Sequence, residues 1–447
     1  MTKWWFRSDT LFKSILKNTG KLGSTKFIGA LLGLVALICT GRGLRPHDFG
    51  VLTMIGAYAE SVSSIAQFQS WQIVLHYASI PWKNGNRDRV KTTIQFALGL
   101  DLCTSLIGTI AGVGALLLFS HPLGIHAHHK HLVLLYCILI PGMSASSVYG
   151  ILRLFDRVDI VSNQQVVTPT VRAILCAIVF FTKGGLVGFV WAWFLGALAG
   201  QLYMWITAWI ELKRHNLRDA FRPDLFRATR EMPKGSWSFV WATSINVVLE
   251  SAWEPVTNLI IGRILGTSAS GLYRLATTFL DSVQRPAKLL EKSYYPEVVR
   301  LDPRTQEPWR LALHTSLLSA LIGIVATLVV YIGGKPVISI FGHRYADAAQ
   351  LMVWMSPSLI FFMAGLSMEG VLYTAGRARY IMYVQFIAVA VYIPLLITMG
   401  HRYGLNGVGF AYTIGMIFLT LLTFGLTMIT FLRRRFIIPP HEQDIAS

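Results

Sequence analysis

Charged residues are scarce in this sequence. Only 14% of the 447 residues are Asp, Glu, Lys or Arg, whereas 53% are hydrophobic, and this balance lies outside the range of soluble globular domains. Acidic residues are the scarcer kind, with 22 Asp and Glu against 40 Lys and Arg. The composition therefore indicates a polytopic membrane protein with an excess of positive charge.

Cysteine and the common catalytic motifs are also scarce or absent. Each of the four cysteines lies inside an apolar run, which is typical of small buried side chains rather than of disulfides or metal ligands. The sequence has no Walker A or HExxH motif and no long loop that could hold a glycosyltransferase site. We therefore expect no enzyme activity and no bound cofactor. The histidine-rich stretch at 121–131 is either a solvated loop or a zinc or pH-sensing site.

Twelve hydrophobic windows are long enough to cross a bilayer. They fall at about 22–41, 49–78, 92–119, 131–152, 164–182, 185–211, 236–261, 267–290, 311–333, 348–374, 379–399 and 406–432. When the connections are assigned to alternate sides, 28 Lys and Arg fall on one side and eight on the other. Because basic loops remain in the cytoplasm, both termini are predicted to be cytoplasmic. The basic excess thus follows membrane sidedness and does not indicate nucleic-acid binding.

An internal repeat divides the chain into two halves. The pairs matched at an offset of 221 residues are Gly41 and Gly262, Gly50 and Gly271, and Glu60 and Asp281. The predicted domains are a six-helix bundle over 1–211, a cytoplasmic linker over 212–235, a second six-helix bundle over 236–433 and a cytoplasmic tail over 434–447. Because each copy holds six helices, both insert with the same orientation, and a pseudo-twofold axis along the membrane normal is expected to relate them.

The eighth predicted span carries too much charge for a helix surrounded by lipid. Arg274, Asp281, Arg285, Lys288 and Lys292 share one face at 100° per residue. Charged side chains inside a membrane face protein or water. We therefore predict that Arg274, Arg285 and Lys288 line a hydrated cavity and bind substrate. For Lys288 and Lys292, snorkelling to the headgroups is an equal alternative.

Five further charged residues lie within predicted spans. Arg172, at mid-depth with no acid within a turn, is predicted to bind substrate, and so is Lys26 unless it snorkels. Glu250 and Glu254 share a helix face and would repel each other unless one is protonated or each has a cation. They are candidates for H⁺ or Na⁺ coupling, or for an ion pair with the basic span. Asp101 either contacts a coupling ion or sugar hydroxyl, or pairs with Arg172 or Lys26.

Short motifs in both halves resemble a known family. They are GRGLRPHDFG at 41–50, LGTSASGLY at 265–273, LRLFDR at 152–157 and the Tyr295-Pro296 pair. This chain resembles the Wzx-like polysaccharide flippases of the multidrug/oligosaccharidyl-lipid/polysaccharide (MOP) exporter superfamily. The resemblance implies an all-α integral membrane protein with twelve transmembrane helices in two six-helix bundles, the MOP exporter fold, working by alternating access.

The resemblance also implies a function and partners. The expected activity is transfer of an undecaprenyl-pyrophosphate-linked oligosaccharide to the periplasmic leaflet of the bacterial inner membrane, for O-antigen or exopolysaccharide synthesis. The lipid-linked oligosaccharide and membrane lipids are the expected partners, and a polysaccharide polymerase and a chain-length regulator are further candidates. Two alternatives remain open. One is an ion-coupled multidrug or small-molecule exporter of the same superfamily, and the other is a non-transporting scaffold of a polysaccharide assembly complex.

Overall fold

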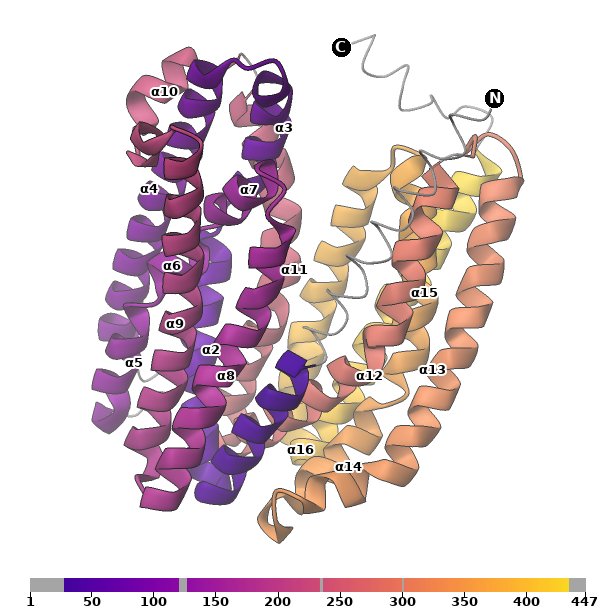
Figure 1. The fold of residues 1–447 in the computed structure, drawn as a ribbon. Coiled ribbons are helices and arrows are strands. Elements are labelled where there is room, and N and C mark those ends of the chain that lie inside the picture. The colour runs from indigo at the N-terminus through magenta and orange to yellow at the C-terminus, as the bar shows by residue number, and fades with distance from the viewer. Residues whose placement is uncertain (1–27, 120–126, 234–235, 300, 434–447) are drawn as a thin grey trace, which may run out of the picture. The chain divides into compact units, whose positions relative to one another are not determined.

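The computed structural model describes residues 28–119, 127–233, 236–299 and 301–433, with the backbone alone described at some positions, including 245–252 and 285–293. Every regular element among these residues is a helix (Figure 1). Each of the twelve predicted windows falls on one or more helices. Within the described ranges, six helices are long and apolar enough to cross a membrane, or seven if one bent pair counts as a single span.

The chain forms two compact units. Unit 1 comprises the described residues of Met1–Arg45 and Ile55–Val256, and unit 2 comprises those of Pro46–Met54 and Thr257–Ser447. Helices α2 (Pro46–Ala66) and α11 (Ser236–Leu265) each contribute residues to both units. The six-helix division at 212–235 stays a prediction.

The first described helix of unit 1 is Ile28–Gly43. The helices that follow α2 in this unit are α3 (Ser70–Lys83), α4 (Arg87–Phe119), η1 (Ala127–His129), α5 (Lys130–Cys137), α6 (Ile140–Ser144), α7 (Ser147–Leu154), α8 (Val158–Thr182), α9 (Gly185–Arg214), η2 (Arg218–Phe221) and α10 (Leu225–Glu231). α8 packs along α9, and α3 packs against both α4 and α7. The connection predicted as a linker contains η2 and α10, and both of these helices pack on α4.

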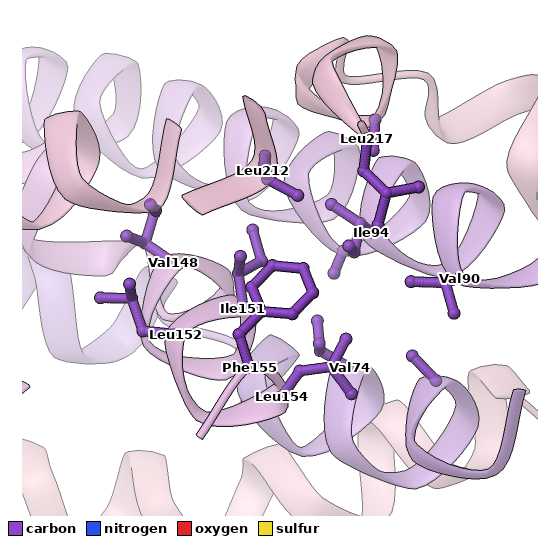
Figure 2. Close-up of a cluster of buried hydrophobic side chains, with 14 of the residues drawn as sticks. Val74, Val90, Ile94, Val148, Ile151, Leu152, Leu154, Phe155, Leu212 and Leu217 are labelled. Carbon is purple, nitrogen blue, oxygen red and sulfur yellow. The ribbon is translucent and has the colours of Figure 1, made fainter. Parts of the chain in front are cut away.

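A hydrophobic cluster holds the short helices of unit 1 against the long ones (Figure 2). Val74 of α3, Ile94 of α4, Ile151 of α7 and Leu212 of α9 are fully buried in it. Burial of such a side chain contributes roughly 1.5–3 kcal/mol. The cluster thus packs α3 and α7 against α4 and α9.

Unit 2 contains the remaining helices, which are longer on average. They are α12 (Thr267–Val299), α13 (Glu307–Ser339), η3 (His343–Tyr345), α14 (Ala346–Met355), α15 (Ser358–Thr374) and α16 (Ala378–Leu432). α13 packs on α15, and α15 packs on α12 and α16. α14 and α15 are bent by 46°, and α16 has a non-helical residue at Gly404, where two predicted windows meet. Exposed apolar side chains such as Ile332 on α13 are those expected to contact lipid.

The helix bounds repeat between the two halves. α4 and α13 both begin and end 220 positions apart, and α7 and α15 end 220 positions apart. The turns that follow contain a left-handed residue in each half, Asp156 with φ 58° and Gly376 with φ 69°. The backbone thus repeats at an offset of 220, one residue from the 221 of the sequence matches, and this supports the duplication inferred from sequence.

Three windows predicted as unbroken helices are interrupted. The window at 348–374 breaks at 356–357, between α14 and α15. The window at 49–78 breaks at residues 67–69, between α2 and α3, and the window at 131–152 breaks twice, at 138–139 and 145–146. The counterparts of 67–69 and 145–146 are 288–290 in α12 and 365–366 in α15, which are helical. These two interruptions therefore distinguish the first copy from the second.

Candidate functional site: polar groups inside each unit

α12 carries the predicted basic face. It is one helix from Thr267 to Val299, so the periodicity on which that prediction rests is present. Arg274 is partly buried and Asp281 is exposed. The side chains of Arg285 and Lys288 lie outside the described residues, and their substrate-binding roles stay predictions.

A buried polar cluster in unit 2 was not found from the sequence. The Ser270 hydroxyl donates a hydrogen bond to Oδ1 of Asn258 at 2.8 Å, and Nδ2 of Asn258 is buried without a hydrogen-bond partner among the described residues. Tyr392, also buried, lies next to Thr257 and Tyr273. The amide of Asn258, within an apolar stretch of α11, was the signal that could have located this cluster. Its groups could bind hydroxyls or an ion.

Arg172 lies where α8 and α9 approach closely. A methyl group at Gly196 of α9 would be 2.8 Å from Cβ of Arg172, so only glycine permits this contact. The Arg172 guanidinium stacks on Trp193, with Cζ 4.6 Å from the ring centroid. Its Nε is buried and has no hydrogen-bond partner among the described residues. The structure thus places a cation with an unused donor inside unit 1, within electrostatic reach of Tyr136.

The other predicted charged residues are only partly described. Glu254 is partly buried on α11, whereas the side chain of Glu250 and all of Lys26 lie outside the described residues. The predicted coupling role of the two glutamates and the substrate-binding role of Lys26 therefore stay predictions.

Asp101 is buried in α4 at 1% exposure. Its Oδ1 accepts a hydrogen bond from the Ser70 hydroxyl at 2.5 Å, and its Oδ2 accepts one from the backbone N–H of Ser147 at 2.8 Å. Both donors are the first residues of helices, α3 and α7. The structure gives Asp101 these partners in place of the ion pair with Arg172 that was one predicted alternative.

An ion-pair network lies where α7, α8 and α9 meet. Arg157, just before α8, donates to Asp159 at 3.1 Å and to Glu211, and Arg214 donates to Glu211 at 2.8 Å. The hydrogen bond to Asp159 raises the pKa of Arg157, so this arginine remains charged. Because Glu211 is buried at the end of α9, the network stabilises the turn before α8 rather than offering Arg157 to a ligand.

The histidine-rich stretch is described only from residue 127 onward. The ring of His128 lies 5.1 Å from that of His129 and 6.4 Å from that of His131. In the part of the chain that the structure describes, no group of three or more His, Cys, Asp or Glu side chains is arranged to hold a metal ion. The alternatives for this loop therefore stay open.

Comparison with known proteins identifies the family. A family of polysaccharide biosynthesis proteins matches residues 15–296. The chain belongs to this polysaccharide biosynthesis protein family. A relative from Escherichia coli (strain K12), named inner membrane protein YghQ, is 41% identical over 351 residues, which cover 78% of this chain and 98% of that protein.

Solved structures show the same fold. A multidrug resistance MATE family transporter of the MOP superfamily, in an inward-facing conformation, matches with a TM-score of 0.72 at 14% identity over 91% of this chain and 95% of that one. The lipid II flippase MurJ, in an inward closed conformation, matches with a TM-score of 0.67 at 14% identity over 93% and 89%. The predicted MOP exporter fold is confirmed.

Proposed function

We propose that this protein is a flippase for an undecaprenyl-pyrophosphate-linked oligosaccharide. It moves the headgroup from the cytoplasmic to the periplasmic leaflet of a bacterial inner membrane by alternating access, with both termini in the cytoplasm. The product serves the assembly of a cell-surface polysaccharide such as O-antigen or exopolysaccharide. The polysaccharide biosynthesis family and the inner-membrane relative support this role.

The observation that carries the proposal is the unused donor of Arg172. A guanidinium in a protein interior normally pairs with an anion or fills all of its donors. Here the guanidinium lies over the ring of Trp193, while Nε has no partner among the described residues. A diphosphate, with about two negative charges, is an anion whose oxygens suit the planar fork of arginine.

The remaining steps follow from the size and chemistry of the substrate. Arg274, Arg285, Lys288 and Lys26 are proposed to offset the desolvation of the diphosphate together with Arg172. The undecaprenyl tail stays in the bilayer while the headgroup crosses, because a long apolar chain is stable there. A fold relative that is named a lipid II flippase supports the idea that this scaffold accommodates a lipid-linked headgroup. Reset of the cycle by H⁺ or Na⁺ at Glu250, Glu254 or Asp101 belongs to the same proposal.

Deletion of the gene, with a leaflet assay, tests the proposal. The deletion should leave an undecaprenyl-pyrophosphate-linked oligosaccharide in the cytoplasmic leaflet, where it is protected from a membrane-impermeant lectin or glycosidase in sealed spheroplasts. Complementation by the wild-type gene should expose it. If the oligosaccharide reaches the outer leaflet normally in the deletion strain, and no second flippase gene accounts for this, the proposal is wrong. A separate co-purification experiment tests whether a polysaccharide polymerase or a chain-length regulator binds this protein.

A further inference from the structure

The connection between α9 and α11 lies beside a membrane span rather than beyond its end. At the end of α10, Glu231 accepts a hydrogen bond from the Thr92 hydroxyl at 2.9 Å. At its start, the backbone nitrogen of Leu225 would be 2.7 Å from a methyl group placed on Gly99. α10 therefore flanks α4 from residue 92 to residue 99, about two turns. Because the apolar window of α4 begins at about 92, these two turns are the ones expected to enter the bilayer.

Exposed tryptophans lie at the same depth. The ring centroid of Trp237, in the first turn of α11, is 5.6 Å from that of Phe96 in α4. Trp237 is nevertheless 39% exposed, and Trp241 is 54% exposed. Tryptophan is enriched where membrane spans meet the lipid headgroups. Since Phe96 lies between Thr92 and Gly99, α10 and Trp237 share the depth expected for headgroups.

Three arginines of the connection are exposed at this depth. They are Arg218, Arg222 and Arg230, and each is within two residues of a hydrogen bond to Thr92 or Gln95 of α4. Within the described ranges, their side chains take part in no hydrogen bond, ion pair or ring contact. Their charges are therefore available to a ligand outside the protein.

The acidic residues of the same connection do not neutralise these arginines. Asp219 pairs with Lys91 of α4 at 3.7 Å. Asp224 caps α10 by accepting a hydrogen bond from the backbone N–H of Arg227, and Glu231 pairs with the Arg227 side chain at 3.2 Å. Each acid thus has a partner of its own, and the three arginines form a surface of one sign.

We propose that Arg218, Arg222 and Arg230 form a docking surface for anionic phospholipid. Phosphodiester headgroups lie at the depth of these side chains, and arginine binds phosphate oxygens with its planar fork. A water-soluble acidic protein would approach from beyond the helix ends, whereas this surface lies beside the apolar part of α4. The excess of basic residues on one side of the membrane sets the orientation of the chain, but it does not require the arginines to lie beside a span.

A bound phospholipid would hold the connection against α4. Its headgroup would neutralise the arginines, and its acyl chains would lie in the bilayer next to α10 and Trp237. Lipid binding should therefore raise the stability of the folded chain. This inference does not depend on which substrate the protein transports.

Thermal unfolding of the full chain in a neutral detergent tests this surface. Phosphatidylglycerol should raise the Tm of the wild type by roughly 2 °C or more over phosphatidylcholine, at about ten times Kd. The combined variant Arg218→Gln, Arg222→Gln and Arg230→Gln should need roughly 100-fold more phosphatidylglycerol for the same rise. The factor follows because each basic residue near an anionic surface contributes about fivefold in affinity.

A matched variant controls for the loss of three charges. It combines Arg263→Gln, Arg344→Gln and Arg402→Gln, which replace exposed arginines predicted to lie on the opposite side of the membrane. This variant should respond to phosphatidylglycerol as the wild type does. The Tm of each variant without added lipid shows whether it folds.

Two further ligands distinguish the source of the phosphate. Inorganic phosphate at equal ionic strength should leave the Tm unchanged, because it has no acyl chain to hold it at the interface. Farnesyl pyrophosphate, a short analogue of a polyprenyl pyrophosphate, should act equally on the wild type and on the variant at Arg218, Arg222 and Arg230.

Three results would overturn the phospholipid surface. The first is an equal Tm of the wild type in phosphatidylglycerol and phosphatidylcholine. The second is an equal loss of the response in both combined variants. The third is a response to farnesyl pyrophosphate that requires the three arginines while phosphatidylglycerol has no effect, since the surface would then bind the transported lipid instead.

Discussion

Gly50 and Gly271, which match each other in the repeat, pack directly against each other in unit 2. A methyl group on Gly271 would lie 2.9 Å from Cα of Gly50, and one on Gly50 would lie 1.7 Å from the carbonyl oxygen of Thr267. The first turns of α2 and α12 therefore touch backbone to backbone. Small residues allow such close approach of membrane helices, which explains why the same residue type stands at this position in both copies.

Gly50→Ala should destabilise the protein. The new methyl group would meet the Thr267 carbonyl, and overpacking of this kind costs typically about 1–3 kcal/mol. Gly56→Ala, on the same helix, is the matched control, because a methyl group there meets nothing within 4 Å and alanine favours a helix by roughly 0.5–1 kcal/mol over glycine. Tm values of the purified variants measure the difference. Equal Tm values would show that α2 and α12 do not touch at Gly50.

Arg172→Ala should reduce glycan export at least about tenfold if this side chain binds the diphosphate, since one charge-assisted contact is worth roughly 1.5–3 kcal/mol. Arg172→Lys should be intermediate, because lysine keeps the charge and loses the planar fork. Surface polysaccharide in a complemented deletion strain measures export. Arg402→Ala, at an exposed arginine, should export normally. Full export by Arg172→Ala at normal protein level would remove Arg172 from the site.

Glu211→Ala should lower stability by about 1–3 kcal/mol. The value is below the 3–5 kcal/mol expected for a broken buried pair, because the Arg157 and Arg214 side chains are 31% and 62% exposed and solvent screens them. Glu231→Ala, which removes an exposed i,i+4 pair with Arg227 and a hydrogen bond from Thr92, should change the free energy of unfolding much less, because solvent screens an exposed pair. Denaturant or thermal unfolding measures both. If Glu231→Ala lost more unfolding free energy than Glu211→Ala, this result would contradict the structural role of Glu211.

Expression of this protein in a drug-sensitive strain should give no resistance to cationic drugs. The charged residues predicted to bind substrate are all basic, and like charges repel a cationic ligand. Minimum inhibitory concentrations for lipophilic cations measure this directly, with a MATE family transporter as the positive control. Resistance above the empty-vector strain would favour the alternative function of a multidrug exporter.

Helix positions were largely determined by the sequence. Long apolar windows, the excess of basic residues on one side and the repeat at an offset of 221 are properties of composition and spacing, and they require no knowledge of packing. The basic face of α12 likewise follows from helical periodicity alone. The family resemblance then supplied the bundle arrangement that periodicity cannot give.

The helix interruptions and their partners were decided by tertiary structure. Ser70 and Ser147 lie 31 and 46 residues from Asp101, and Glu211 lies 54 residues from Arg157. An interruption within an apolar run is stable only where a distant group satisfies the released backbone atoms. Local sequence does not contain that information, because it depends on which helices become neighbours when the chain folds.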